Sequence, residues 1–261
     1  MQRLAFGIEY DGSAYCGWQR QNHSPSIQAV VEAAISKVAN HPVSVFCAGR
    51  TDAGVHAFGQ VIHFDTQALR TEYAWLRGVN TYLPKDVRVL WCKFVPPEFD
   101  ARKSATQRRY CYVISNREVS PGIMHNAMTW VQGKLCINAM QEAAHFLVGK
   151  HDFTSFRGTQ CQAKTPIRTI HRLDILRRGD RVLIDVTANA FLHHMVRNIA
   201  GSLIAVGQHK VSTAWIKEVL EAKDRRKAGM MAAANGLYLL KACYPTNFVL
   251  PLLESEPWFM T

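Results

Sequence analysis

The order of apolar periodicities restricts this chain more than any other feature. Its first half contains strand-like alternation over residues 3–10, 42–48, 60–64 and 87–95, and helical spacing over 24–40 and 71–83. The order is therefore strand, helix, strand, strand, helix, strand. Ser24 or Ser26 can cap the first helix. This βαββαβ order is that of a ferredoxin-like unit.

The second half has the same order of elements, although no residue-level repeat is visible. Strand patterns cover 109–115 and 236–244, and a hairpin over 168–188 turns at Gly179-Asp180. Helical patterns cover 137–149 and 191–207, and a shorter extra helix covers 212–223. The sequence therefore predicts two ferredoxin-like halves.

The predicted fold class is α+β. We expect two fused halves, residues 1–100 and 101–261, with a join in the proline- and charge-rich stretch 95–107. Their strands would form one extended, mainly antiparallel sheet with helices on one face. Loops from both halves would then meet at a central catalytic cleft.

Charge indicates a polyanionic partner. The chain has 31 Lys and Arg against 20 Asp and Glu, a net charge of +11. Basic residues gather in 101–110, 168–181 and 223–227, as expected for phosphate contacts. No apolar run is long enough to span a membrane. The start of the chain is typical of a strand rather than a secretory signal, and the seven dispersed cysteines favour reduced thiols in a cytoplasmic protein.

A glycine-rich loop carries one carboxylate, Asp52, in the stretch CAGRTDAGVHAFGQ (47–60). An Asp in such a loop can simply cap a turn. The same geometry can also hold a nucleophile open to a substrate. Arg50 and Thr51, just before it, could equally contact phosphate. Local sequence alone favours the turn cap.

The helix predicted over 191–207 places Arg197 on a largely apolar surface, where a buried guanidinium needs an acidic partner. A surface Arg with a buried stem is the alternative. The adjacent His193 and His194 could suggest a metal site. Neighbouring residues point in different directions on a helix, however, and no acidic motif accompanies them, so we expect no metal.

Two aromatic positions adjoin basic or polar residues. Tyr110 follows two arginines at the start of a strand, which suits base stacking but equally suits a half-buried strand tyrosine. The loop 11–21 contains Trp18, either a nucleic-acid contact or a packing lid.

Five blocks together resemble the successive signatures of the tRNA pseudouridine synthase A family. They are EYDGSAYCGWQRQ, FCAGRTDAGVHAFGQVIHF, ARKSATQRRYCYVI, HDFTSFR with CQAKTPIRTI, and NAFLHHMVRNIAGSL. The resemblance keeps the family's order, extends to GLYLLKACYP and covers nearly the whole chain. It outweighs the turn-cap interpretation of Asp52.

The resemblance implies an isomerase that converts uridine to pseudouridine at positions 38–40 of the tRNA anticodon stem-loop. It also implies a homodimer that needs neither metal nor organic cofactor. By matching position, Asp52 is the catalytic aspartate and Arg197 its arginine partner. Tyr110 matches the aromatic residue that stacks on the target base, and Arg50 matches an arginine that contacts the nucleotide.

The reaction breaks the N1–C1′ bond and rejoins the base through C5. An ionised Asp52 could attack C1′, attack C6 or assist elimination at the sugar, and the sequence favours none of the three. Arg197 would keep Asp52 charged, and Tyr110 would offset the stacking lost when the base leaves the stem. Residues 227–235 depart from the family's Thr-Ala-Pro-like pattern.

Two other functions are compatible with parts of the pattern. A non-catalytic RNA-binding protein of tandem ferredoxin-like units would need an exposed aromatic strand motif, and no strand here carries one. A nucleotide-handling enzyme would need the lysine of a P-loop or the GxGxxG spacing, and GRTDAG has neither.

Overall fold

The computed structural model describes residues 1–251 and 257–260 and divides the chain into two compact units. Unit 1 comprises Met1–Thr106 and the described part of Leu239–Ser255, and unit 2 comprises Gln107–Tyr238 and the described part of Glu256–Thr261. Residues 239–251 therefore return to unit 1, and residues 257–260 belong again to unit 2. Among the described residues, no helix has the length and apolar character required to cross a membrane.

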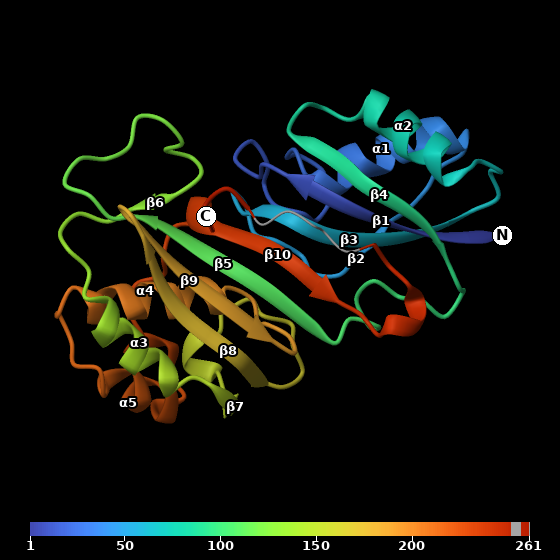
Figure 1. The fold of residues 1–261 in the computed structure, drawn as a ribbon. Helices are drawn as coiled ribbons and strands as arrows, with labels where there is room; N and C mark the ends of the chain where they lie inside the picture. The colour runs from blue at the N-terminus through green and yellow to red at the C-terminus, as the bar shows by residue number, and fades with distance from the viewer. Residues whose placement is uncertain (252–256, 261) are drawn as a thin grey trace. The chain divides into compact units, whose positions relative to one another are not determined.

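Unit 1 is a mainly antiparallel sheet with two helices (Figure 1). The strand order is β4-β1-β3-β10, and β2 pairs with β3. The elements are β1 (Gln2–Tyr10), α1 (Ile27–Ala39), β2 (Phe46–Cys47), β3 (His56–Thr66), α2 (Glu72–Tyr82), β4 (Val87–Val95) and the end of β10 (Leu237–Cys243). A 3₁₀ turn, Thr246–Phe248, follows β10.

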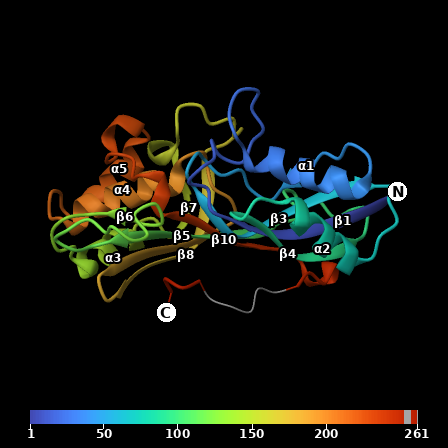
Figure 2. The ribbon, with the colours of Figure 1, turned by 90° about the horizontal axis from the view of Figure 1, so that it is seen from above.

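One face of the unit 1 sheet packs on its helices. Alternation puts Leu4, Phe6 and Ile8 on this face, and all three are fully buried. The rings of Phe6 and Phe64 meet edge-to-face at 5.0 Å, and the Phe64 ring lies 5.6 Å from that of Trp75 on α2. Figure 2 shows α1 on one side of β1 and β3. These aromatic contacts hold α2 against β1 and β3, the two strands next to the Asp52 loop.

The opposite face of this sheet is covered by irregular segments rather than helices. Phe99 is fully buried there with Ala5 and Val61, and its ring contacts Tyr244 at 5.1 Å. The Ala101 N–H donates to Nδ1 of His63 at 3.0 Å. Burial lowers the pKa of His63, which keeps this ring neutral and able to accept. Residues 95–106 of the predicted join are therefore packed within unit 1, despite their proline and charge.

Unit 2 has the strand order β5-β9-β8-β7, with the short β6 parallel to β5. Its elements are β5 (Gln107–Ser115), β6 (Thr129–Trp130), α3 (Ile137–His145), β7 (Gly149–Asp152), β8 (Ile167–Arg178), β9 (Arg181–Ala188), α4 (Met195–Gly207) and α5 (Trp215–Ala222). Short 3₁₀ turns occur at Thr154–Phe156, Arg225–Lys227 and Ala234–Gly236. Figure 2 shows α4 and α5 on one side of β5 and β8. The predicted α+β class is confirmed.

Local chemistry explains where elements differ from the sequence prediction. The strand expected over 42–48 is reduced to Phe46–Cys47, because the N–H groups of Val43 and Val45 donate to the Ser36 hydroxyl and the Glu32 carboxylate on α1. The hairpin turn at Gly179-Asp180 is confirmed, and Gly179 has a φ of 58°.

Candidate active site

Asp52 lies in unit 1, in the loop between β2 and β3. The loop leaves the sheet after Ala48, whose N–H donates to the Val61 carbonyl at 2.8 Å. It then turns back where the Val55 N–H donates to the Asp52 carbonyl at 3.2 Å. Gly54 takes the left-handed φ of 75° that this turn requires. Asp52 is half-buried at the apex of a closed, internally bonded turn.

A buried polar network lies beneath this loop. The Thr51 hydroxyl and the Tyr10 phenol are 2.7 Å apart, and the Gln60 amide donates to the Gly49 carbonyl at 2.6 Å. Gln60 also donates to the Tyr10 oxygen at 3.5 Å. Gln60 is fully buried, and Tyr10 and Thr51 are nearly so. Paired buried polar groups hold one geometry, so the backbone leading into Asp52 is fixed.

A second loop, residues 11–18, supports the Asp52 loop from its side. The backbone N–H of Trp18 donates to the Thr51 carbonyl at 3.0 Å, and the backbone N–H of Gly54 donates to the Tyr15 carbonyl at 3.2 Å. Trp18 is 2% exposed, and its ring contacts Tyr10 at 6.1 Å. Of the two roles considered for Trp18, the structure shows packing.

Gly17 marks a second close approach of the two loops, after Gly12, whose added Cβ would lie 2.0 Å from the Val55 carbonyl oxygen. Its φ is 88°, and a Cβ there would lie 2.7 Å from the Thr51 carbonyl oxygen and 3.0 Å from the Asp52 carbonyl carbon. Only glycine permits both the backbone angle and this distance. Gly17, one of the two glycines of the 11–21 stretch, thus helps to set the position of Asp52.

Charged groups also hold the first half of the 11–18 loop, at Asp11 and Tyr15. Desolvation raises the pKa of Asp11, but hydrogen bonds from Ser13 and attraction to His56 outweigh it and leave the pKa lowered. The Tyr15 phenol donates to Asp86 at 2.9 Å. Burial first, and then this carboxylate, raises the pKa of Tyr15 above its usual value. Residues 11 and 15 of this loop are therefore held by charge-assisted hydrogen bonds.

Arg50 and Tyr110 lie in quite different surroundings. Arg50 is exposed, two residues before Asp52. Tyr110 belongs to β5 of unit 2, opposite Val186 on β9, and is 8% exposed. Its ring meets that of Phe191 edge-to-face at 5.0 Å. Its neighbour Arg109 forms two bonds, of 2.9 and 2.8 Å, to the buried Asp185 carboxylate.

The helix of Arg197 starts later than the sequence predicts. α4 begins at Met195, and His194 precedes it with a left-handed φ of 63°. The rings of His193 and His194 stack 3.6 Å apart, so the prediction that they diverge on a helix is wrong. Arg197 is half-buried in the first turn of α4, and its Nε donates to the Ala232 carbonyl at 2.9 Å.

The basic stretch 223–227 is partly used within unit 2. Arg225 donates through Nη2 to the Asn198 side chain at 2.8 Å. Arg226 binds both oxygens of Asp224 and extends into solvent. Of these two arginines, Arg226 is the more accessible for a phosphate contact.

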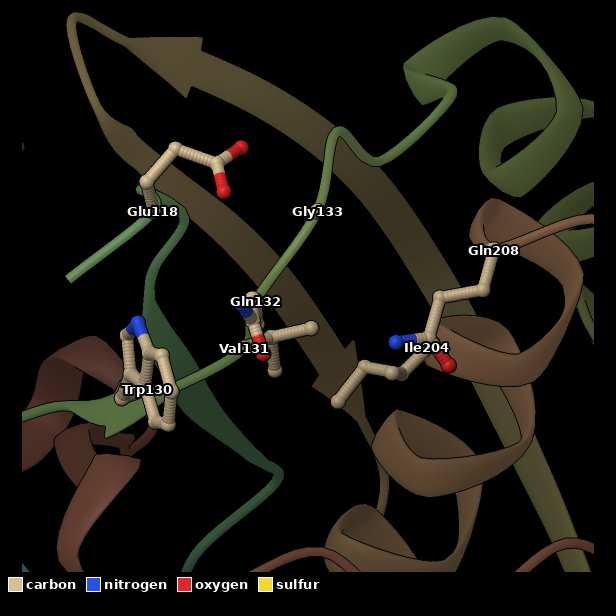
Figure 3. Close-up of a pocket in the computed structure, with 7 residues that line it drawn as sticks. All are labelled: Glu118, Trp130, Val131, Gln132, Gly133, Ile204 and Gln208. Atoms are coloured by element: carbon tan, nitrogen blue, oxygen red, sulfur yellow. The ribbon is translucent and has the colours of Figure 1, made fainter. Parts of the chain in front are cut away.

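Two hollows lie apart from the predicted site residues. An open hollow of about 630 Å³ separates the 130–133 segment from the end of α4, with Glu118, Ile204 and Gln208 on its wall (Figure 3). A cavity of about 280 Å³ in unit 1 is lined by Trp91, Leu250 and other largely apolar residues. Asp52, Arg50, Tyr110 and Arg197 are not among the lining residues of either hollow.

Comparison with known proteins defines the class as pseudouridine synthase, an isomerase. The family model described as tRNA pseudouridine synthase matches residues 8–102 and 143–245. "tRNA pseudouridine synthase A" of Pseudoalteromonas atlantica is 53% identical over 99% of this chain and 98% of that protein, and the protein of the same name from Shewanella woodyi is 54% identical over 99% of both. The chain belongs to the tRNA pseudouridine synthase family.

Solved structures add only a weak likeness. The Cbf5-Nop10-Gar1 complex contains a chain with a TM-score of 0.37 and 14% identity, matched over 91% of this protein and 49% of that chain. No functional conclusion follows from a match of this size.

Proposed function

We propose that this protein isomerises uridine to pseudouridine in tRNA, at positions 38–40 of the anticodon stem-loop, with Asp52 as the catalytic carboxylate. Family membership supports the reaction class. The observation that carries the role of Asp52 is the network beneath it, where Thr51, Tyr10 and Gln60 hold the loop that presents this carboxylate in one geometry. Such bracing is the preorganisation that catalysis requires.

The isomerisation needs no net redox change. The N1–C1′ bond breaks and a C5–C1′ bond forms, while C5 loses a proton and N1 gains one. The Asp52 carboxylate could form a transient bond to C1′ or C6, or assist loss of a proton from the sugar. In each case it must be ionised at the start.

Three further residues complete the proposed site. Arg197 would pair with Asp52 and keep it charged in a site from which water is excluded. Tyr110 would stack on the target base once it has left the stem, since aromatic platforms offset lost stacking. Arg50, which is exposed, would contact the phosphate or sugar of a neighbouring nucleotide.

The remaining parts of the proposal follow from the family resemblance. The enzyme would act as a cytoplasmic homodimer on tRNA, without metal or organic cofactor. The net charge of +11 supports a polyanionic substrate, and binding should weaken as salt increases.

The test is pseudouridine formation in an unmodified tRNA transcript, mapped chemically at each uridine. Asp52→Asn keeps the size of the side chain and removes its charge, so we expect tRNA binding without product. Asp180→Asn is the matched control, because Asp180 is an exposed aspartate in the β8–β9 turn. It should react like the unmodified enzyme.

Two outcomes would contradict the proposal. Product formation by Asp52→Asn at more than about a thousandth of the normal rate would remove Asp52 from the nucleophile role. Binding of tRNA without conversion by the unmodified protein would favour the non-catalytic RNA-binding alternative.

A further inference from the structure

Residues 229–232, which depart from the family pattern, lie directly against α4. A Cβ on Gly201 would fall 1.8 Å from the Met230 carbonyl oxygen and 3.1 Å from the Ala232 nitrogen. Because Gly201 has no side chain, the backbone of residues 230–232 can pack directly against α4 at this position. One residue further along α4, the Ser202 hydroxyl accepts the Gly229 N–H at 3.0 Å.

The contact ends on Arg197, one helical turn before Gly201. The Ala232 N–H donates to the Arg197 carbonyl at 3.1 Å, and the Arg197 Nε donates to the Ala232 carbonyl at 2.9 Å. Ala232 therefore donates to and accepts from the same arginine, once through that arginine's backbone carbonyl and once through its side chain. Because the guanidinium is planar, a bond at Nε fixes the plane in which both Nη groups lie.

The residues on both sides of this segment are hydrogen-bonded to other elements of unit 2. Before it, Arg225 binds the Asn198 side chain at 2.8 Å. After it, the Tyr112 phenol donates to the Ala233 carbonyl at 2.8 Å. The segment cannot slide along α4 without breaking one of these bonds.

We propose that residues 229–232 are a positioning element for Arg197 and that Gly201 is the helix position that admits it. This inference rests on the proposed role of Arg197 in the reaction. It also explains the run of three alanines, residues 232–234, that begins at the end of this segment. Ala232 acts through its N–H and C=O groups, so the side chains of 232–234 need only be small enough for the backbone to approach α4.

The test compares two glycine-to-alanine variants of the same helix. Gly201→Ala must displace the backbone at Met230. Gly207→Ala, the matched control, meets the flexible Met140 side chain at 2.6 Å, at the other end of α4. We expect Gly201→Ala to lower kcat about tenfold or more with tRNA Kd within about twofold, and Gly207→Ala to leave both within about twofold.

A spectroscopic measurement separates positioning from a general loss of stability. The Arg197 Nε–H resonance, identified by its absence in Arg197→Lys, should shift and exchange faster with water in Gly201→Ala but not in Gly207→Ala. If Gly201→Ala folds poorly, Ser202→Ala provides a milder test, since it removes the acceptor for the Gly229 N–H without adding atoms. It should produce the same changes to a smaller extent.

The outcomes distinguish this inference from the proposed function. An unchanged Arg197 resonance or unchanged kcat in well-folded Gly201→Ala would overturn the positioning role alone. Adding Gly201→Ala to Arg197→Met should cause no further loss of the residual single-turnover rate, because both changes act through one group. Additive losses would overturn positioning, whereas normal turnover by Arg197→Met would overturn the proposed role of Arg197 itself.

Discussion

Replacing Gly17 by alanine should inactivate the enzyme without touching any proposed catalytic side chain. Gly17 has a φ of 88°, and an alanine Cβ would lie 2.7 Å from the Thr51 carbonyl oxygen. Ordinary van der Waals contact begins at 3.4 Å, about 0.7 Å more, so the backbone next to Asp52 must move. Displacement on that scale at a reacting group costs about tenfold or more in rate.

Stability should fall as well, for two separate reasons. A non-glycine residue at positive φ costs about 1–2 kcal/mol, and overpacking adds about 1–3 kcal/mol. Gly133→Ala is the control, because Gly133 has a similar φ of 78° but nothing within 4 Å of the added Cβ. It should show only the backbone cost, a fall in Tm of about 2–4 °C for each kcal/mol.

The assay is single-turnover pseudouridine formation at a temperature where both variants are folded, with Tm measured in parallel. We expect a rate loss in Gly17→Ala only. Full activity in Gly17→Ala, or an equal rate loss in Gly133→Ala, would refute the claim that the 11–18 loop sets the position of Asp52.

Three further predictions concern the same site. Arg197→Met should lose nearly all turnover while the fold stays intact, because it removes the proposed charged partner of the catalytic carboxylate; near-normal turnover in a well-folded variant would contradict the pairing. Tyr10→Phe removes the 2.7 Å contact with Thr51 and should destabilise the fold by about 1–3 kcal/mol while lowering kcat, measured by thermal unfolding and turnover. Burial raises the pKa of Cys47 to about 12, so at pH 8 roughly one thiol in ten thousand is ionised and alkylation should be very slow. The exposed Cys16 should be labelled first in peptide mass spectra, and equal labelling of both in folded protein would mean that the Asp52 loop opens readily.

The sequence predicted most of the secondary structure and the α+β class. Strand alternation and helical spacing are local properties, so β4, α2 and the β8–β9 hairpin lie close to the predicted ranges. One strand prediction was wrong because side chains of the preceding helix satisfied backbone groups of the strand. The strand expected over 42–48 is shortened because α1 side chains accept two of its N–H groups.

The sequence by itself determined which residue types could do chemistry: one carboxylate in a glycine loop, an arginine on an apolar helix and a signature shared with a family. Tertiary structure decided what holds them. Thr51, Tyr10 and Gln60 meet through contacts spanning up to 50 residues, and Ala232 reaches Arg197 across 35. Hydrogen bonds made by backbone groups, such as those of Ala232, leave no pattern of residue types in the sequence, because every residue except proline supplies the same N–H and C=O. The geometry around Asp52 and Arg197 therefore becomes visible only when the chain is folded.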